Sequence, residues 1–258
     1  MYFCGKSDIG KRRQVNQDSV CAVNVWNGEA VLLIVCDGMG GHKAGEIASR
    51  TAIEVFYDKI ATSPCYEATS ESILEFIRYI LVCAASDANA AVHSLAGEND
   101  EFLGMGTTLV AVLIYKGYFY AINIGDSRFY IVTRHETRQV SKDHSFVQYL
   151  IDNGKLSPEE AKSYPRKNVI TRAIGVSEKL DVDFFNAPLE PWESGYLLLC
   201  SDGLSNYIDE KILTDILYDA TTVNINPETE LSRKADRLIA YANEKGGNDN
   251  ISVVLAKF

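Results

Sequence analysis

The sequence predicts an α+β fold in which two sheets stack on each other and helices lie outside them. Short apolar runs bounded by Gly, Asp and Asn indicate buried strands, and they come in two blocks, one in the first 36 residues and one from Gly104 to Val140. Long stretches with the apolar spacing of helices accompany each block. A sheet-on-sheet core with helices outside satisfies both patterns.

The first block of strands, interrupted by a turn at 26–29, leads into two predicted helices over 45–60 and 71–95. Each helix is predicted because apolar residues recur every three or four positions and therefore share one face. These residues are Ile47, Ala48, Thr51, Ala52, Val55 and Phe56 in the first helix, and Ile73, Leu74, Ile77, Ile80, Leu81, Ala84 and Ala85 in the second. The residues between the helices, 62–70, include Pro64 and are expected to form a loop.

The second block contains predicted strands over 107–115, 118–124 and 129–133. The segment 144–182 breaks this pattern with glycine and proline, carries a short predicted helix over 146–153, and is expected to be an insertion over one edge of the core. A strand over 196–200, helices over 209–220 and 231–244, and a strand over 251–258 complete the prediction. No linker, repeat or low-complexity segment divides the sequence, so we expect a single domain over residues 1–258.

Composition limits the classes of protein and partner. Of the 258 residues, 47% are hydrophobic, which is enough for a large core and excludes general disorder. The net charge of −10 argues against binding to nucleic acid or to an anionic membrane. The six cysteines show no CxxC spacing, so reduced thiols are expected, and neither a signal peptide nor an apolar run of ~20 residues is evident. We therefore expect a cytoplasmic protein.

Five aspartates stand where predicted strands begin or end. Asp37, Asp126 and Asp202 each follow an apolar run, whereas Asp18 and Asp249 each precede one. If the first three strands run antiparallel to the last two, all five carboxylates meet at one end of a sheet. The sequence therefore predicts a carboxylate cluster.

Such a cluster favours divalent cations. Carboxylates at close range raise each other's pKa, and several stay ionised together only when cations balance their charge. Hard divalent metals take oxygen ligands and water. Each motif alone could be a turn at the end of a strand, so the metal interpretation depends on all of them together. Gly38 allows a backbone carbonyl to approach a cation, and Arg13 can bind a phosphoryl group bidentately.

The sequence closely resembles the metal-dependent serine/threonine protein phosphatases of type 2C, the PPM family, and in particular its bacterial branch. The resemblance runs along the whole chain and rests on ordered motifs. They are Asp8-Ile-Gly-Lys-Arg-Arg13-Gln-Val-Asn16-Gln-Asp18, Asp37-Gly-Met-Gly-Gly-His42, Gly45-Glu46, Gly104-Met-Gly-Thr-Thr108, Asn123-Ile-Gly-Asp-Ser-Arg128, Asp143-His144-Ser145, Asn168-Val-Ile-Thr-Arg172-Ala-Ile-Gly175, Ser201-Asp-Gly-Leu204 and Asn248-Asp-Asn-Ile-Ser252.

The resemblance implies two antiparallel sheets flanked by pairs of helices, a four-layer αββα sandwich, with a binuclear Mg²⁺ or Mn²⁺ centre at one end. Asp37 would bridge the two metals. Asp202 and Asp249 would complete the first metal site, and the backbone carbonyl of Gly38 would bind the second. Asp18 would act through metal-bound water.

Further roles follow from the same resemblance. Asp126, together with Asp202, would form a weaker third metal site, and Arg13 would grip the substrate phosphate. The segment from about 145 to 186 matches the family's flap, a small subdomain that borders the active site.

The implied activity is hydrolysis of phosphoserine and phosphothreonine in proteins. A hydroxide that bridges the two metals would attack phosphorus in line, without a covalent phosphoenzyme. The expected partners are phosphorylated proteins and a serine/threonine kinase whose action the enzyme reverses, and the default oligomeric state is a monomer. Two alternatives stay open: a pseudophosphatase that uses the same fold for binding, and a related metal phosphoesterase that acts on small phosphorylated metabolites.

The proton donor for the leaving alkoxide is the one departure from the eukaryotic branch. There, a histidine two residues after the bridging aspartate is proposed as general acid, and Met39 stands at that position here, as in the bacterial branch. The remaining donors are His42 and water bound to a metal. We expect a minor role for His42, which would fix the glycine turn.

Overall fold

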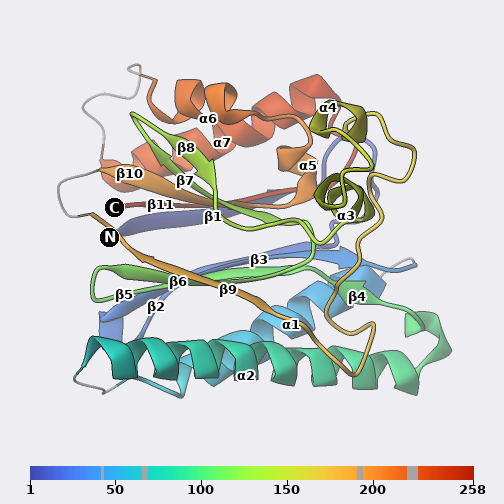
Figure 1. Ribbon diagram of the computed structural model, residues 1–258, viewed down its shortest axis with the longest axis horizontal. Helices are drawn as coiled ribbons and strands as arrows, with labels where there is room; N and C mark the ends of the chain where they lie inside the picture. Colours follow the sequence, from blue (N-terminus) through green and yellow to red (C-terminus); the bar gives the residue numbers. More distant parts are fainter. Residues whose placement is uncertain (42–43, 66–68, 191–193, 220–225) are drawn as a thin grey trace.

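Strand β3 (Ala30–Met39) is buried along most of its length, so a layer of protein must lie on each side of it. Its alternate side chains divide between two cores: Leu32 and Ile34 face the helices, whereas Leu33 and Val35 face a second sheet. The computed structural model describes residues 1–41, 44–65, 69–190, 194–219 and 226–258 and shows the layers helix, sheet, sheet, helix (Figure 1). The predicted α+β sandwich of two antiparallel sheets is confirmed.

All the paired strands in both sheets are antiparallel. The first sheet has the order β2-β3-β5-β6-β9, with β4 paired to the end of β3. Its other strands are β2 (Asp18–Val25), β4 (Gly106–Thr107), β5 (Leu109–Tyr115), β6 (Tyr118–Ile124) and β9 (Asp183–Pro188). The second sheet has the order β1-β11-β10-β7-β8. Its strands are β1 (Tyr2–Asp8), β7 (Arg128–Thr133), β8 (Thr137–Gln139), β10 (Gly195–Cys200) and β11 (Ile251–Lys257).

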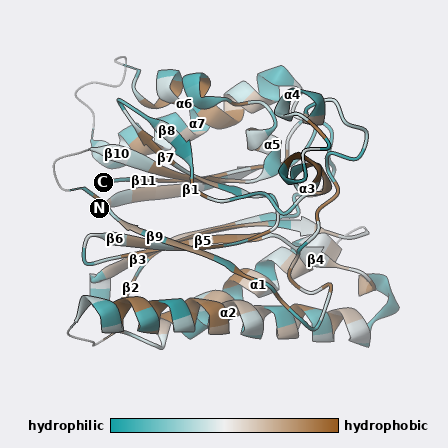
Figure 2. Cartoon of the chain, in the orientation of Figure 1, coloured by the Kyte–Doolittle hydropathy of each residue, from teal (hydrophilic) through white to brown (hydrophobic). Residues whose placement is uncertain are grey.

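Two helices cover the outer face of each sheet (Figure 1). The first sheet carries α1 (Ala44–Ala61) and α2 (Ser70–Glu98), and the second carries α6 (Glu210–Leu217) and α7 (Pro227–Lys245). Hydrophobic and hydrophilic residues alternate along α2, as expected of a helix with one buried face (Figure 2). Shorter elements are η1 (Trp26–Gly28), η2 (Asp100–Phe102), α3 (Phe146–Asp152), α4 (Pro158–Ala161) and α5 (Asp202–Ser205).

The α2 helix differs from expectation in one respect. By length and composition it could cross a membrane, although no apolar run of that kind was expected. In the fold, its apolar residues Ile77, Leu81 and Ala84 are fully buried in the core that α2 shares with α1 and the first sheet. The composition of α2 is therefore that of a core helix.

Three further elements differ from the prediction. Residues 183–186, placed in the flap by the sequence, form most of β9 and pair with β6; Asn186 and Pro188 make this edge strand hard to recognise. Helix α7 begins at Pro227, four residues before the predicted start, because the Asn226 side chain caps it and proline is favoured in the first turn. The short helix α5 was not predicted, and it starts at Asp202 itself.

Close packing of α5 against the start of β11 leaves no room for a side chain at Gly203. A Cβ atom at Gly203 would lie 1.9 Å from the carbonyl oxygen of Asn250, which is far inside van der Waals contact. Because Asn250 is 3% exposed and holds several backbone groups, the chain there has little room to move.

We therefore predict that Gly203→Ala lowers the free energy of unfolding by about 1–3 kcal/mol, the usual cost of forcing extra volume into a packed site. Gly97→Ala is the matched control, since nothing lies within 4 Å of a Cβ atom at Gly97 in α2. Urea denaturation should show the control unchanged or more stable by up to ~1 kcal/mol. Equal stabilities of the two variants would contradict this account of the α5–β11 contact.

Candidate metal centre

Two of the predicted site residues lie directly opposite each other in the first sheet. Asp18, the first residue of β2, is the cross-strand partner of Asp37 near the end of β3. Like charges in opposite positions of an antiparallel pair are unfavourable. Asp126 follows β6, two strands away from β3 in the same sheet. The first sheet therefore brings three carboxylates to one end.

The other two aspartates come from the second sheet. Asp202 begins α5 directly after β10, and Asp249 precedes β11, the neighbour of β10. All five carboxylates were expected at one end of a single sheet; the structure instead distributes them over both sheets. Strand polarity alone could not distinguish these arrangements, since both place the same strand ends at one edge.

Direct contacts join the two sheets at this end. Asp37 and Asp202 lie close enough that the charge of Asp202 helps to raise the pKa of Asp37. Ser201, at the end of β10, donates its hydroxyl to Asp18 Oδ2 over 2.7 Å. The carboxylates therefore meet between the sheets.

Burial and mutual repulsion raise the pKa values of these carboxyls. Burial is the largest cause for Asp37, followed by the charges of Asp18 and Asp202, and it moves the pKa of Asp37 well above its ordinary value. Burial and then the charge of Asp202 raise the pKa of Asp126 to about 7. Burial also raises the pKa of Asp18 and of Asp202. Burial and like charge therefore both favour protonation of these carboxyls unless cations bind.

The donor set fits hard divalent cations. Asp18 Oδ1 and Asp202 Oδ1 are buried without a hydrogen-bond partner among the described residues. Burial of such oxygens costs free energy unless a positively charged group binds them. Every predicted side-chain ligand offers oxygen, which is the donor that Mg²⁺ and Mn²⁺ prefer. However, no three His, Cys, Asp or Glu side chains in the described ranges already form a complete ligand set for one ion.

Arg13 pairs with one of the predicted ligands. Its Nη2 atom donates to Asp249 Oδ2 over 2.7 Å, so the guanidinium occupies one oxygen of a predicted ligand. The Arg13 side chain is 47% exposed and can therefore move without disturbing the core. The structure thus places Arg13 at the carboxylate cluster, bound to Asp249.

Backbone contacts fix the chain around Asp37 and Gly38. Thr108 accepts a hydrogen bond from the peptide N–H of Asp37 with its hydroxyl and donates its own N–H to the Asp37 carbonyl, both over 2.9 Å. A Cβ atom at Gly38 would lie 2.0 Å from the carbonyl oxygen of Gly45 and 2.5 Å from that of Gln17. Only glycine fits where β3 passes the start of α1.

Sequence reasoning gave no role to Thr108, Ser201 or Asn250. Asn250 is 3% exposed and ties three segments together, accepting from the Gln17 N–H and donating to the carbonyls of Ile9 and Val15. Each of these residues lies within one of the quoted motifs, and Ser201 and Asn250 are also next to a predicted ligand. That adjacency was the available signal, but a hydroxyl or amide beside a turn gives no indication of which distant segment it will bind.

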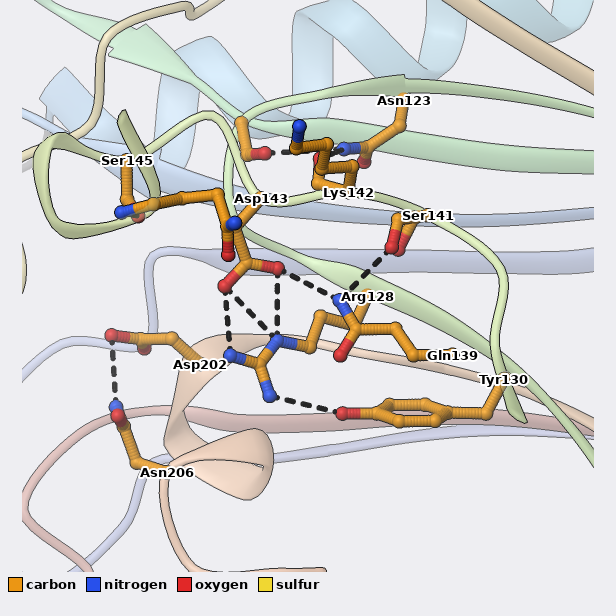
Figure 3. A network of polar contacts seen from close by, with 12 residues as sticks. Asn123, Arg128, Tyr130, Gln139, Ser141, Lys142, Asp143, Ser145, Asp202 and Asn206 are labelled. Carbon is orange, nitrogen blue, oxygen red and sulfur yellow. Dashed lines mark hydrogen bonds and ion pairs between the residues drawn. The ribbon is translucent and has the colours of Figure 1, made fainter. Parts of the chain in front are cut away.

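A second charged network lies beside the cluster (Figure 3). Arg128 binds both carboxylate oxygens of Asp143, over 2.9 Å from Nε and 2.7 Å from Nη2, and its Nη1 donates to the Tyr130 hydroxyl over 3.1 Å. Asp143 also raises the pKa of Asp126, so its pairing with Arg128 moderates the negative charge beside that carboxyl.

A cavity of about 460 Å³ opens next to this network. It lies between the segment that carries α3 and α4 and the residues around α5. Asp126, Arg128 and Asp202 line one part of it, and Lys162 and Lys167 line another. The cluster is therefore accessible from a cleft large enough for several side chains.

His144 is buried behind Asp126. Its Nδ1 atom accepts from the Gly125 N–H over 3.1 Å, and its Nε2 atom lies 3.1 Å from Asp183 Oδ2. Burial is the main cause that lowers the pKa of His144, which favours the neutral ring. His42, by contrast, lies outside the described residues, and its predicted minor role stays a prediction.

Comparisons with known proteins agree with this geometry. A profile of the family described as Protein phosphatase 2C matches residues 4–241. The serine/threonine phosphatase stp of Listeria monocytogenes is 37% identical over 252 residues, which cover 98% of this chain and 94% of that protein.

Solved structures agree as well. The serine/threonine phosphatase Stp1 from Staphylococcus aureus superimposes with a TM-score of 0.86 at 31% identity, covering 99% of this chain and 94% of that one. The catalytic domain of the serine/threonine protein phosphatase PstP in complex with two manganese ions superimposes with a TM-score of 0.78 at 31% identity, covering 98% and 96%. The chain therefore belongs to the bacterial branch of the protein phosphatase 2C family, the metal-dependent serine/threonine protein phosphatases.

Proposed function

We propose that this phosphatase hydrolyses phosphoserine and phosphothreonine in proteins directly, by in-line attack of water and without a covalent phosphoenzyme, and so reverses a serine/threonine kinase. The observation that carries the proposal is the convergence of five aspartates from two sheets, with buried carboxylate oxygens that lack a partner among the described residues. Phosphate esters carry the opposite charge to the cations that such a cluster would bind.

The residues proposed to hold two Mg²⁺ or Mn²⁺ ions are Asp37, Asp202, Asp249 and the carbonyl of Gly38, with Asp18 acting through water. When bound, the cations supply positive charge for the transferring phosphoryl group and make water a better nucleophile. The PstP catalytic domain, in complex with two manganese ions, supports this number. Asp126 would hold a weaker third ion together with Asp202, whose carboxylate lies close enough to raise its pKa.

Arg13 is proposed to bind the substrate phosphate. In the structure its guanidinium is paired with Asp249. A cation bound by Asp249 would replace the charge that Arg13 supplies, and the guanidinium would then be free for a bidentate contact with phosphate. Arg13 would therefore exchange one anionic partner for another as the site fills.

The cleft beside Asp126 and Asp202 supports a polypeptide substrate, since it continues away from the carboxylates between α5 and the flap. We propose a single catalytic domain over residues 1–258 with a flap beginning near 145, acting as a cytoplasmic monomer that binds neither nucleic acid nor membrane. The net charge of −10 is consistent with those last two features. The leaving alkoxide would receive its proton from water at the site, and His42 would contribute little.

Metal removal tests the proposal most simply. EDTA should abolish hydrolysis of p-nitrophenyl phosphate, and Mn²⁺ or Mg²⁺ should restore it better than Zn²⁺, because the ligands are all oxygens. The measurement is activity after chelation and again after titration with each metal. Full activity of the metal-free enzyme would refute the proposal.

Substitution of individual aspartates should distinguish the two tightly bound cations from the weaker third one. Asp37→Asn and Asp202→Asn each remove charge from a shared ligand and should lower kcat by more than about a hundredfold. Asp126→Asn should leave two Mn²⁺ ions bound tightly, as measured by calorimetry. Loss of all Mn²⁺ binding in Asp126→Asn would contradict the assignment of that residue.

Arg13→Ala should lower kcat/KM about tenfold to a hundredfold, because a charge-assisted bidentate contact is worth roughly 1.5–3 kcal/mol. Arg12→Ala is the matched control, since Arg12 is an exposed neighbour of the same charge. Steady-state kinetics on a phosphopeptide and thermal unfolding of both variants provide the measurements. An unchanged kcat/KM in Arg13→Ala would exclude Arg13 from phosphate binding.

A further inference from the structure

His144 contacts three segments of the chain and has no role in the proposed reaction. It is 7% exposed and contacts the turn after β6, the start of β9 and the flap residue Arg172. A neutral imidazole has one nitrogen that accepts and one that donates. The two ring nitrogens of His144 can therefore be assigned separately from their partners.

The accepting nitrogen fixes the peptide that precedes Asp126. Nδ1 accepts from the Gly125 N–H over 3.1 Å, and the backbone N–H of His144 donates to the Gly125 carbonyl over 2.9 Å. Both polar groups of Gly125 are thus held by one residue. Asn123 donates a second hydrogen bond to the same carbonyl over 3.2 Å.

The backbone of Gly125 has an unusual conformation and is closely packed. Its φ of +111° is a conformation that glycine adopts far more readily than other residues. A Cβ atom there would lie 2.6 Å from Thr108 Cγ2, so the turn rests closely on the threonine whose hydroxyl and N–H bind Asp37. The direction of the Asp126 side chain therefore depends on how the Gly125 peptide is held.

The donating nitrogen connects this turn to the flap. Since Nδ1 accepts, Nε2 carries the proton, and its acceptor is Asp183 Oδ2 at 3.1 Å. Arg172 Nη1 lies 3.0 Å from the same nitrogen but is itself a donor, so it does not bond to the protonated Nε2. Arg172 donates to the other oxygen, Asp183 Oδ1, over 2.8 Å. The Thr171 N–H also donates to the His144 carbonyl over 2.7 Å, and Ile170 forms a β-bridge with Ser145, so the flap segment at 170–172 lies along His144.

We propose that His144 is a positioning residue that orients Asp126: its Nδ1 atom holds the Gly125 peptide, and its Nε2 atom anchors the ring to Asp183 and thereby to the flap. This inference rests on the proposed function of Asp126 as a ligand of the weaker cation. It assigns His144 no contact with the phosphate or the cations. The resemblance to the phosphatase family placed His144 in a motif but gave it no such role.

Two conservative substitutions separate the two nitrogens. In His144→Asn, the side-chain oxygen takes the place of Nδ1 and can still accept from Gly125, whereas the bond to Asp183 is lost. In His144→Gln, the amide nitrogen takes the place of Nε2 and can still donate to Asp183, whereas the bond to Gly125 is lost. His144→Ala loses both, and His135→Asn, in the exposed turn between β7 and β8, is the matched control.

The first readout is hydrogen exchange of the Gly125 amide in metal-free protein. We expect His144→Asn and His135→Asn to keep its protection and His144→Gln and His144→Ala to exchange about tenfold faster or more, as expected for a lost hydrogen bond. Equal protection in His144→Gln and the unmutated protein would overturn the proposal. Because no metal is present, this readout is independent of whether Asp126 binds a cation.

The second readout is calorimetric affinity for the weakest Mn²⁺ ion. It should fall about 10- to 100-fold in His144→Gln and His144→Ala, the usual effect of removing a group that orients a ligand, and should change little in His144→Asn. Lost amide protection with unchanged Mn²⁺ affinity would overturn the positioning role, provided that Asp126→Asn does lower that affinity. If Asp126→Asn leaves the affinity unchanged, the assignment of Asp126 as a ligand is what fails.

Discussion

Repulsion among buried carboxylates is the constraint on which the rest of this structure depends. The two sheets bring Asp18, Asp37 and Asp202 close together at one end of the sandwich, where burial and like charge raise their pKa values. A fold that only had to be stable would not collect these groups, because each costs free energy when it is ionised and unpaired. Bound divalent cations turn that cost into favourable coordination, so the cluster connects the fold with the activity of the family.

The neighbouring polar contacts limit this cost and hold the carboxylates in place. Arg13 pairs with Asp249, Arg128 pairs with Asp143, and Ser201 donates across the sheets to Asp18. The two arginines differ in whether they can leave their carboxylate partners. Arg13 is exposed enough to leave Asp249 for a phosphate, whereas Arg128 is held by two residues and serves as a fixed counter-charge. His144 belongs with the fixed group in our proposal, since it holds the backbone before Asp126.

Much of the fold and the composition of the cluster could be predicted from the sequence, because strands buried on both faces appear as continuous apolar runs and three of these runs, in β3, β6 and β10, lead to an aspartate. The pairing of Asp18 with Asp37 across one sheet, and the placement of Asp202 and Asp249 at the end of the other, could not be predicted, since periodicity does not assign strands to sheets. Edge strand β9 was missed because asparagine and proline hide its pattern. The Arg13–Asp249 pair was missed because contacts between distant segments leave no local signal.

Proton release on metal binding tests the central claim most directly. If burial and repulsion keep some of the carboxyls protonated, as the pKa of about 7 for Asp126 indicates, cations must displace those protons. Raised pKa values mean that the protonated fraction grows as the pH falls through 7. Calorimetry of Mn²⁺ binding in buffers of different ionisation enthalpy should therefore show proton release that increases from pH 8 to pH 6. Binding of Mn²⁺ without proton release at pH 6 would contradict the account.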